Sequence, residues 1–335
     1  MIRRLPFVVV SSALQWAPAI ILLVLLLGFG GFSPRFLTIQ NLGAILAQSS
    51  WLVVVALGMN LVLLTAGVDL SVGVAMYLAA VAVGLGLAGA PLWACLPVAI
   101  LVGVLFGAAN GFIVVRFNLP PFIVTLATTF AGRGLGIYFS ATKIVYASTG
   151  VAALGRATVL GLPVPLVMAG LAVLLAWALL RATPLGVYVR SIGANREGAF
   201  RAGVPVAAVT WATYAISGGF AGLAGFVSLC QTSAASAAFG QNAEFLAIAA
   251  AVLGGTSLFG GRGSWWAPVL GGVLITTVQN GLVMVDANPY AYPVITGSVI
   301  FLAALIDSVR TRLAARFERV SAGLESDIKP KASRP

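Results

Sequence analysis

Apolar residues fill most of this chain in long blocks, and short polar stretches separate the blocks. A helix needs roughly 20 apolar residues to cross a bilayer. By this measure we predict ten membrane-spanning helices, at about 16–32, 42–65, 70–89, 92–115, 119–139, 163–181, 206–229, 243–259, 264–285 and 290–307. The pattern therefore predicts an all-α fold, a polytopic membrane helix bundle of about ten transmembrane helices.

Composition supports a membrane protein. The chain is 60% hydrophobic and 8% charged, whereas soluble domains are about half apolar and about a quarter charged. Because no stretch outside the blocks is long enough to bury a core, we expect a single transmembrane domain, 1–308. A polar cytoplasmic tail, 309–335, follows it.

The placement of the basic residues predicts the orientation. With the N-terminus inside, fifteen of the 19 Lys and Arg residues fall on one side of the membrane. Arg35, Lys143 and Arg156 fall on the other, and Arg133 lies in the fifth block. Lys and Arg accumulate in cytoplasmic loops. We therefore expect both termini to be cytoplasmic in a bacterial inner membrane, and we read the net charge of +11 as a topology signal.

One polar island, 182–205, interrupts the apolar pattern. Asn195 is a favoured helix cap, and Glu197 would lie in the first turn of a short helix over 195–202, where a carboxylate is favourable. A short ordered helix on the inner face offers a surface to a soluble partner. The residues we expect to couple the chain to that partner are Arg190, Asn195, Arg196, Glu197, Arg201 and Gly203.

The sequence also excludes several functions. It has no histidine, and none of its three lysines follows a glycine, so a phosphate-binding Gly-Lys-Ser/Thr loop is absent. Its two cysteines have no metal or redox spacing, and its eight acidic residues form no cluster. We therefore expect no enzyme activity, no metal and no cofactor.

A weak internal repeat accompanies the blocks. Asn110-Gly111 followed by Pro120-Pro121 is echoed by Asn280-Gly281 followed by Pro289 and Pro293. Glycine-rich breaks also recur, at 67–73 and 254–263. Transporters are often built from repeated halves. A chance match of common membrane residues is the alternative.

Asp69 lies between the second and third blocks. A bare carboxylate in hydrocarbon is costly, so it must be capped, paired or hydrated. We interpret it as an N-cap of the third span, helped by Ser71, with Gly67 and Gly73 allowing close packing. Contact with the substrate or with a coupling ion is the alternative.

The fifth block suggests a translocation pathway. Pro121, Thr125, Thr128 and Gly132 share one helical face that is small and weakly polar. The face could line a route shared by two copies, with Thr296 in the second half contributing likewise. Alternatively, it packs closely against other helices, with the hydroxyls bonding their own backbone.

Two further charges stand near predicted span ends. Arg133 lies between two glycines and could extend to the outer headgroups or face the pathway mouth. Glu244 opens the eighth block, where a first helical turn favours a carboxylate.

Four motifs in order resemble the permease subunits of ribose/xylose/galactose-type ATP-binding-cassette sugar importers. They are Ala56-Leu-Gly58-Met-Asn60 with Thr65-Ala-Gly67-Val-Asp69-Leu-Ser71-Val-Gly73, Asn110-Gly111 with Pro121-Phe122-Ile-Val-Thr125-Leu-Ala-Thr128, Gly193-Ala-Asn195, and Glu244 to Gly261. The resemblance covers about 40–308. One departure is Ala66, where a second glycine is usual, and we expect Gly67 to supply the bend.

This resemblance implies the partners and the substrate. It implies a second permease copy in a homodimer or heterodimer, a cytoplasmic ATPase subunit, a periplasmic sugar-binding protein and the lipid bilayer, with no nucleic acid. The imported solute would be a pentose, a hexose or a related polyol. A branched-chain amino acid or nucleoside permease, or an ion-coupled secondary transporter, is the alternative.

Overall fold

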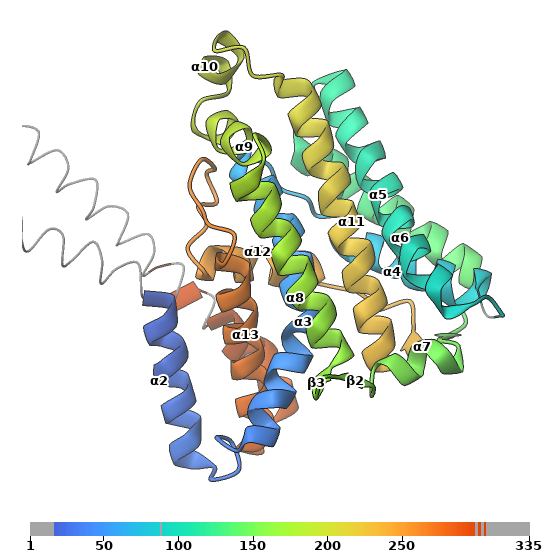
Figure 1. Cartoon of the computed structure of the whole chain (residues 1–335), viewed down its shortest axis with the longest axis vertical. Helices are drawn as coiled ribbons and strands as arrows, with labels where there is room; N and C mark the ends of the chain where they lie inside the picture. The colour runs from blue at the N-terminus through green and yellow to red at the C-terminus, as the bar shows by residue number, and fades with distance from the viewer. Residues whose placement is uncertain (1–16, 88, 299–300, 303–304, 306–335) are drawn as a thin grey trace, which may run out of the picture.

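The computed structural model describes residues 17–87, 89–298, 301–302 and 305, which form a helix bundle (Figure 1). Its longer helices are α2 (Ala17–Phe32), α3 (Ile39–Leu64), α4 (Val72–Gly86), α5 (Leu92–Phe117), α6 (Pro121–Ser140), α8 (Val164–Trp177), α11 (Val206–Thr232), α12 (Ala243–Leu253) and α13 (Ala267–Met284). The shorter ones are α7 (Thr149–Leu154), η1 (Ala178–Ala182), α9 (Leu185–Ala194), α10 (Arg196–Arg201) and η2 (Pro289–Ala291), and 292–298 are also helical. The predicted tail, 309–335, lies outside the described residues.

The all-α, polytopic prediction is confirmed. Within the described residues, six helices are long and apolar enough to cross a membrane, and α2, α4 and α12 are shorter apolar helices. The prediction of complete helical spans at 70–89 and 243–259 was wrong. At 1.5 Å per residue, the 15 residues of α4 and the 11 of α12 reach only about 22 and 16 Å, short of a bilayer core of about 30 Å.

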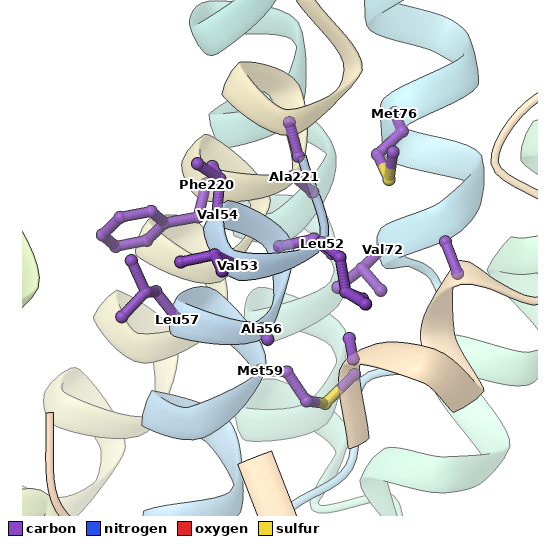
Figure 2. Close-up of a cluster of buried hydrophobic side chains, with 14 of the residues drawn as sticks. Leu52, Val53, Val54, Ala56, Leu57, Met59, Val72, Met76, Phe220 and Ala221 are labelled. Carbon is purple, nitrogen blue, oxygen red and sulfur yellow. The ribbon is translucent and has the colours of Figure 1, made fainter. Parts of the chain in front are cut away.

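The centre of the bundle is α3. Gly58 of α3 contacts Ser217 of α11, and nearer the start of α3 the Ala47 carbonyl accepts a 2.6 Å bond from Gln231 Nε2, near the end of α11. The two helices are therefore antiparallel. Figure 2 shows side chains of α3 meeting Phe220 and Ala221 of α11, with Val72 and Met76 of α4 close by. Every residue of α3 from Leu52 to Leu64 is buried, which explains why this segment is apolar except for Asn60.

Glycines join α5 to α11. A Cβ added at Gly103 or Gly107 of α5 would strike the backbone of α11, and one at Gly218 or Gly222 would strike that of α5. Small residues of this kind let two helix backbones approach closely in a membrane.

The bundle has two distinct ends (Figure 1). At one end lie α9 and α10; we call it the α10 end. At the other, the strand end, β1 (Val145–Tyr146) pairs with β4 (Ala234–Ala235), and β2 (Thr158–Val159) pairs with β3 (Leu162–Pro163). The cations of the described loops separate accordingly, with Arg116, Arg181, Arg190, Arg196, Arg201 and Arg262 toward the α10 end and Arg35, Lys143 and Arg156 toward the strand end.

Two crossings combine a half-length helix with a non-helical segment. After α3 reaches the α10 end, 65–71 turn back into the bundle and α4 runs on toward the strand end beside α11. After α11 reaches the strand end, 233–242 turn back and α12 runs toward the α10 end, where Gly261 N bonds to Leu64 O. The two crossings therefore have inverted directions, an arrangement common among transporters built from repeats.

The inverted arrangement corrects one part of the predicted repeat. The Asn110-Gly111 and Asn280-Gly281 pairs do occupy corresponding helices, α5 and α13, each of which follows a half-length helix. The glycine-rich break at 254–263 does not correspond to 67–73, because it follows α12 instead of preceding it. The segment that corresponds to 67–73 is 233–242, which holds a single glycine.

Candidate functional site

The short helix predicted within the polar island is present as α10. Asn195 Oδ1 accepts a 2.9 Å bond from Gly198 N and so caps α10. Glu197 lies in the first turn and forms a 3.0 Å ion pair with Arg201 on the exposed face. Gly203, with φ of 83°, ends the segment in a left-handed conformation that favours glycine.

Close backbone contacts connect this segment to the bundle. Gly193 packs against the Leu64 carbonyl and the Gly261 amide so closely that a Cβ would not fit. Arg190 Nη1 donates to Gly186 O at 2.7 Å, and burial, together with the charge of Arg181, lowers the pKa of Arg190. A displacement of α9 and α10 would therefore act directly on the end of α3 and on the loop after α12.

The outer face of α10 is open. Phe200 is 67% exposed, and Arg196, Glu197 and Arg201 are exposed beside it. Phe200, Arg196 and Glu197, together with residues 204–208 at the start of α11, line a groove of about 580 Å³. An exposed aromatic residue among charges at the end of a membrane bundle is suited to insertion into a soluble protein partner.

Polar side chains stabilise the non-helical segment 65–71 between α3 and α4, which we call the first break. Asp69 is 1% exposed, and its Oδ1 accepts bonds from Ser71 N (3.0 Å) and Ser71 Oγ (2.6 Å). Its Oδ2 accepts a 3.3 Å bond from Ser217 Oγ of α11, and Asn110 Nδ2 donates to Ser71 Oγ at 2.7 Å. The structure places Ser71 at the N-cap of α4, with Asp69 two residues before it.

The bend before Asp69 differs from the expected one. Ala66 itself takes the left-handed conformation, with φ of 60°, and Gly67 does not. Gly67 is needed for space instead, because a Cβ there would lie 2.9 Å from Tyr214 Oη. Gly73 is likewise needed for space, since the backbone of Gly240 lies against it.

The predicted pathway face of α6 is partly covered by the chain itself: Thr125 and Gly132 are buried, and Pro121 and Thr128 are half-buried. Thr125 is fully buried and its hydroxyl donates to Pro121 O at 3.0 Å, while Thr128 Oγ1 donates to Thr125 O at 3.1 Å. Gly132 packs on Phe106 of α5 and Val74 of α4. These contacts match the packing alternative. Thr296 is 9% exposed in the helical stretch 292–298.

Several polar contacts between distant segments were not anticipated. Asn60 Oδ1 accepts a 2.7 Å bond from Thr256 Oγ1, and Asn41 and Asn280 exchange two amide bonds. Arg133 Nη1 donates to two carbonyls of the segment before α12. Asn60 and Asn280 stand in the motifs and the repeat found in the sequence, whereas Asn41 does not, and no spacing rule indicates which distant residue each one contacts.

A polytopic bundle with half-length helices inside it is the architecture of a membrane transporter. The chain matches, over residues 41–304, the family described as branched-chain amino acid transport system/permease component. It is 38% identical to the D-allose transport system permease protein of Escherichia coli K12, over 86% of this chain and 89% of that protein. It is 36% identical to the ribose import permease protein of the same organism, over 86% and 92%. No solved structure gives a significant match.

The chain belongs to this permease family. It is a multi-pass inner-membrane protein and a permease component of an ATP-binding-cassette importer, not an enzyme. Such permeases work with an ATPase and a binding protein.

Proposed function

We propose that this permease moves a monosaccharide, delivered by a periplasmic binding protein, across the inner membrane. The observation that carries the proposal is the similarity, along 86% of the chain, to permeases named for D-allose and ribose. A permease named for fructose, from Bifidobacterium longum, is 32% identical over 92% of the chain. The substrate class is therefore a sugar or a related polyol.

The chain crosses the membrane ten times in this proposal. The ten crossings are the six long helices, α2, the helix that begins at 292, and the two crossings that contain α4 and α12. The basic residues of the α10 end support a cytoplasmic position for that end and for both termini. Residues 1–308 are then one membrane domain, with 182–205 as its cytoplasmic coupling loop and 309–335 as its tail.

The α10 end docks on the ATPase in this proposal. The docking surface is formed or supported by Arg190, Asn195, Arg196, Glu197, Arg201 and Gly203. The exposed Phe200 and the cap at Asn195 support this role, because a preorganised helix binds with less loss of conformational entropy. Glu197→Arg and Gly203→Trp should abolish transport while the protein still inserts into the membrane.

A second permease copy completes the route. We place the route beside α6 and the helix that carries Thr296, with the packing of Thr125, Thr128 and Gly132 fixing the position of α6. The first break lets α4 begin inside the bundle, and it is shaped by Gly67, Asp69, Ser71 and Gly73.

Uptake into proteoliposomes tests the substrate. Vesicles should contain this permease and its ATPase, with the binding protein added outside and ATP inside. Uptake of labelled D-allose or D-ribose, and not of L-leucine, is the expected result. Uptake of L-leucine alone would favour the branched-chain amino acid alternative and overturn the sugar assignment.

A further inference from the structure

The two breaks in the bundle differ in exposure. In the first, 65–71, only Ala66 is exposed and the polar Asp69 and Ser71 are buried in protein. In the second, 233–242, five residues are exposed: Ser236, Ala237, Ala238, Gln241 and Asn242. One non-helical segment is thus covered by the chain itself, and the other is not.

The second break runs from β4 at the strand end to a position deep within the bundle. Its Gly240 touches Gly73 at the start of α4. Gly225 lies seven residues before the end of α11 and packs on Met76 of α4. Because α4 runs parallel to α11, Gly73 lies three residues further from the strand end than Met76 does. At 1.5 Å per residue, the Gly73–Gly240 contact is about 15 Å from the strand end of α11. A bilayer core of about 30 Å includes this depth.

An exposed non-helical segment at this depth cannot face lipid. Unpaired backbone groups in hydrocarbon cost several kcal/mol each, so irregular backbone at membrane depth is found only where protein or a water-filled cavity surrounds it. The amides of Gln241 and Asn242 add to that cost. The exposed amides of Gln241 and Asn242, which follow Gly240, must therefore face water or a second copy of the chain.

The segment is firmly positioned. Arg133 Nη1 donates to Ala237 O at 3.0 Å and to Phe239 O at 2.7 Å, and its guanidinium lies 5.2 Å from the centre of the Tyr77 ring. The carboxylate of Glu244, which is in the first turn of α12, lies beside Gly73 of α4. A fixed backbone of this kind presents its side chains in one arrangement, as a binding surface requires.

We propose that this segment contacts the sugar in transit: the amides of Gln241 and Asn242 hydrogen-bond its hydroxyls, and Phe245 contacts its apolar face. Each amide both donates and accepts, which matches a polyol. Phe245 is 58% exposed in the first turn of α12, three residues after Asn242. Neutral amides hold such a ligand weakly enough for release. The inference rests on the proposed sugar transport.

Thiol accessibility is the first test. In a chain whose buried Cys95 and Cys230 are replaced by alanine, Ala238→Cys and Gln241→Cys are introduced one at a time. A membrane-impermeant methanethiosulfonate reagent should label both, and labelling rates should change by about tenfold or more between nucleotide-free and ATP-trapped complexes. Leu171→Cys is the control, because Leu171 is 63% exposed near the middle of α8 and should stay unlabelled.

Transport is the second test. Gln241→Leu keeps the side-chain volume and removes the amide, so sugar uptake should fall about tenfold, while binding-protein-stimulated ATP hydrolysis continues. Gln241→Asn should restore part of the uptake.

Two results would overturn the inference while the wild-type complex imports sugar: no labelling at 238 and 241 in any nucleotide state, or full uptake by Gln241→Leu. A wild-type complex that imports no sugar would instead refute the proposed function, whatever the labelling.

Discussion

Arg133 of α6 donates a 2.7 Å hydrogen bond to the carbonyl oxygen of Phe239, 106 residues further along the chain. The sequence left two positions open for this guanidinium, the outer headgroups and the pathway mouth. The structure places it against the non-helical segment before α12. A charged donor with two backbone carbonyl acceptors stabilises a segment that has no helix hydrogen bonds of its own.

Replacing Arg133 should therefore disorder that segment. Arg133→Met removes two charge-assisted hydrogen bonds, each worth about 1.5–3 kcal/mol. Sugar uptake should fall by at least tenfold, and the melting temperature of the purified protein should fall. Arg133→Lys should retain part of both, because an ammonium can still bond one carbonyl.

The matched control is Arg156→Met at the strand end, where Arg156 is exposed. It should leave uptake and melting temperature unchanged. If Arg133→Met and Arg156→Met behave alike, the bonds to Ala237 and Phe239 do not hold the segment.

The cap of α10 predicts a specific loss of coupling. Asn195→Ala removes the bond to Gly198 N and should destabilise the six-residue helix by about 1 kcal/mol. Stimulation of ATP hydrolysis by the sugar-loaded binding protein should fall severalfold, with membrane insertion unchanged. Asn195→Asp, another favoured cap, should keep the stimulation. Equal stimulation in Asn195→Ala and wild type would argue against a docking role for α10.

The glycine contact between α5 and α11 predicts a large effect from one methyl group. Gly218→Ala places a Cβ against the backbone of Gly103, which cannot move without shifting the whole helix. Overpacking of this kind costs about 1–3 kcal/mol. The control is Gly170→Ala in α8, where nothing lies within 4 Å of an added Cβ, and alanine should stabilise the helix slightly. Thermal unfolding in detergent measures both; similar melting temperatures would refute the contact.

How far the sequence predicts this structure depends on the physical signal. Helix positions follow from apolar length, and the cap at Asn195 follows from local chemistry, so both could be predicted. The breaks could not be predicted in full, because hydropathy measures solvent preference and not backbone path: α12 lies within an apolar block yet spans 11 residues. The partners of Asn60 and Arg133 are set by three-dimensional packing, which local spacing does not encode.

Ala66 illustrates that limit and gives a further prediction. Its φ of 60° is favourable for glycine and unfavourable for alanine. Ala66→Gly should therefore stabilise the protein by about 1 kcal/mol, seen as a higher melting temperature. Gly67→Ala is the comparison and should destabilise it, because the added Cβ would crowd Tyr214 Oη. A lower melting temperature for Ala66→Gly would show that the bend does not strain Ala66.

In the proposed function, ATP hydrolysis by a separate subunit drives sugar import through this permease. D-allose or D-ribose uptake by proteoliposomes, with ATP, the ATPase and the binding protein each omitted in turn, tests this dependence. We expect uptake only when all three are present, and loss of that uptake in Glu197→Arg. Uptake driven by a proton or sodium gradient in vesicles without the ATPase would contradict it.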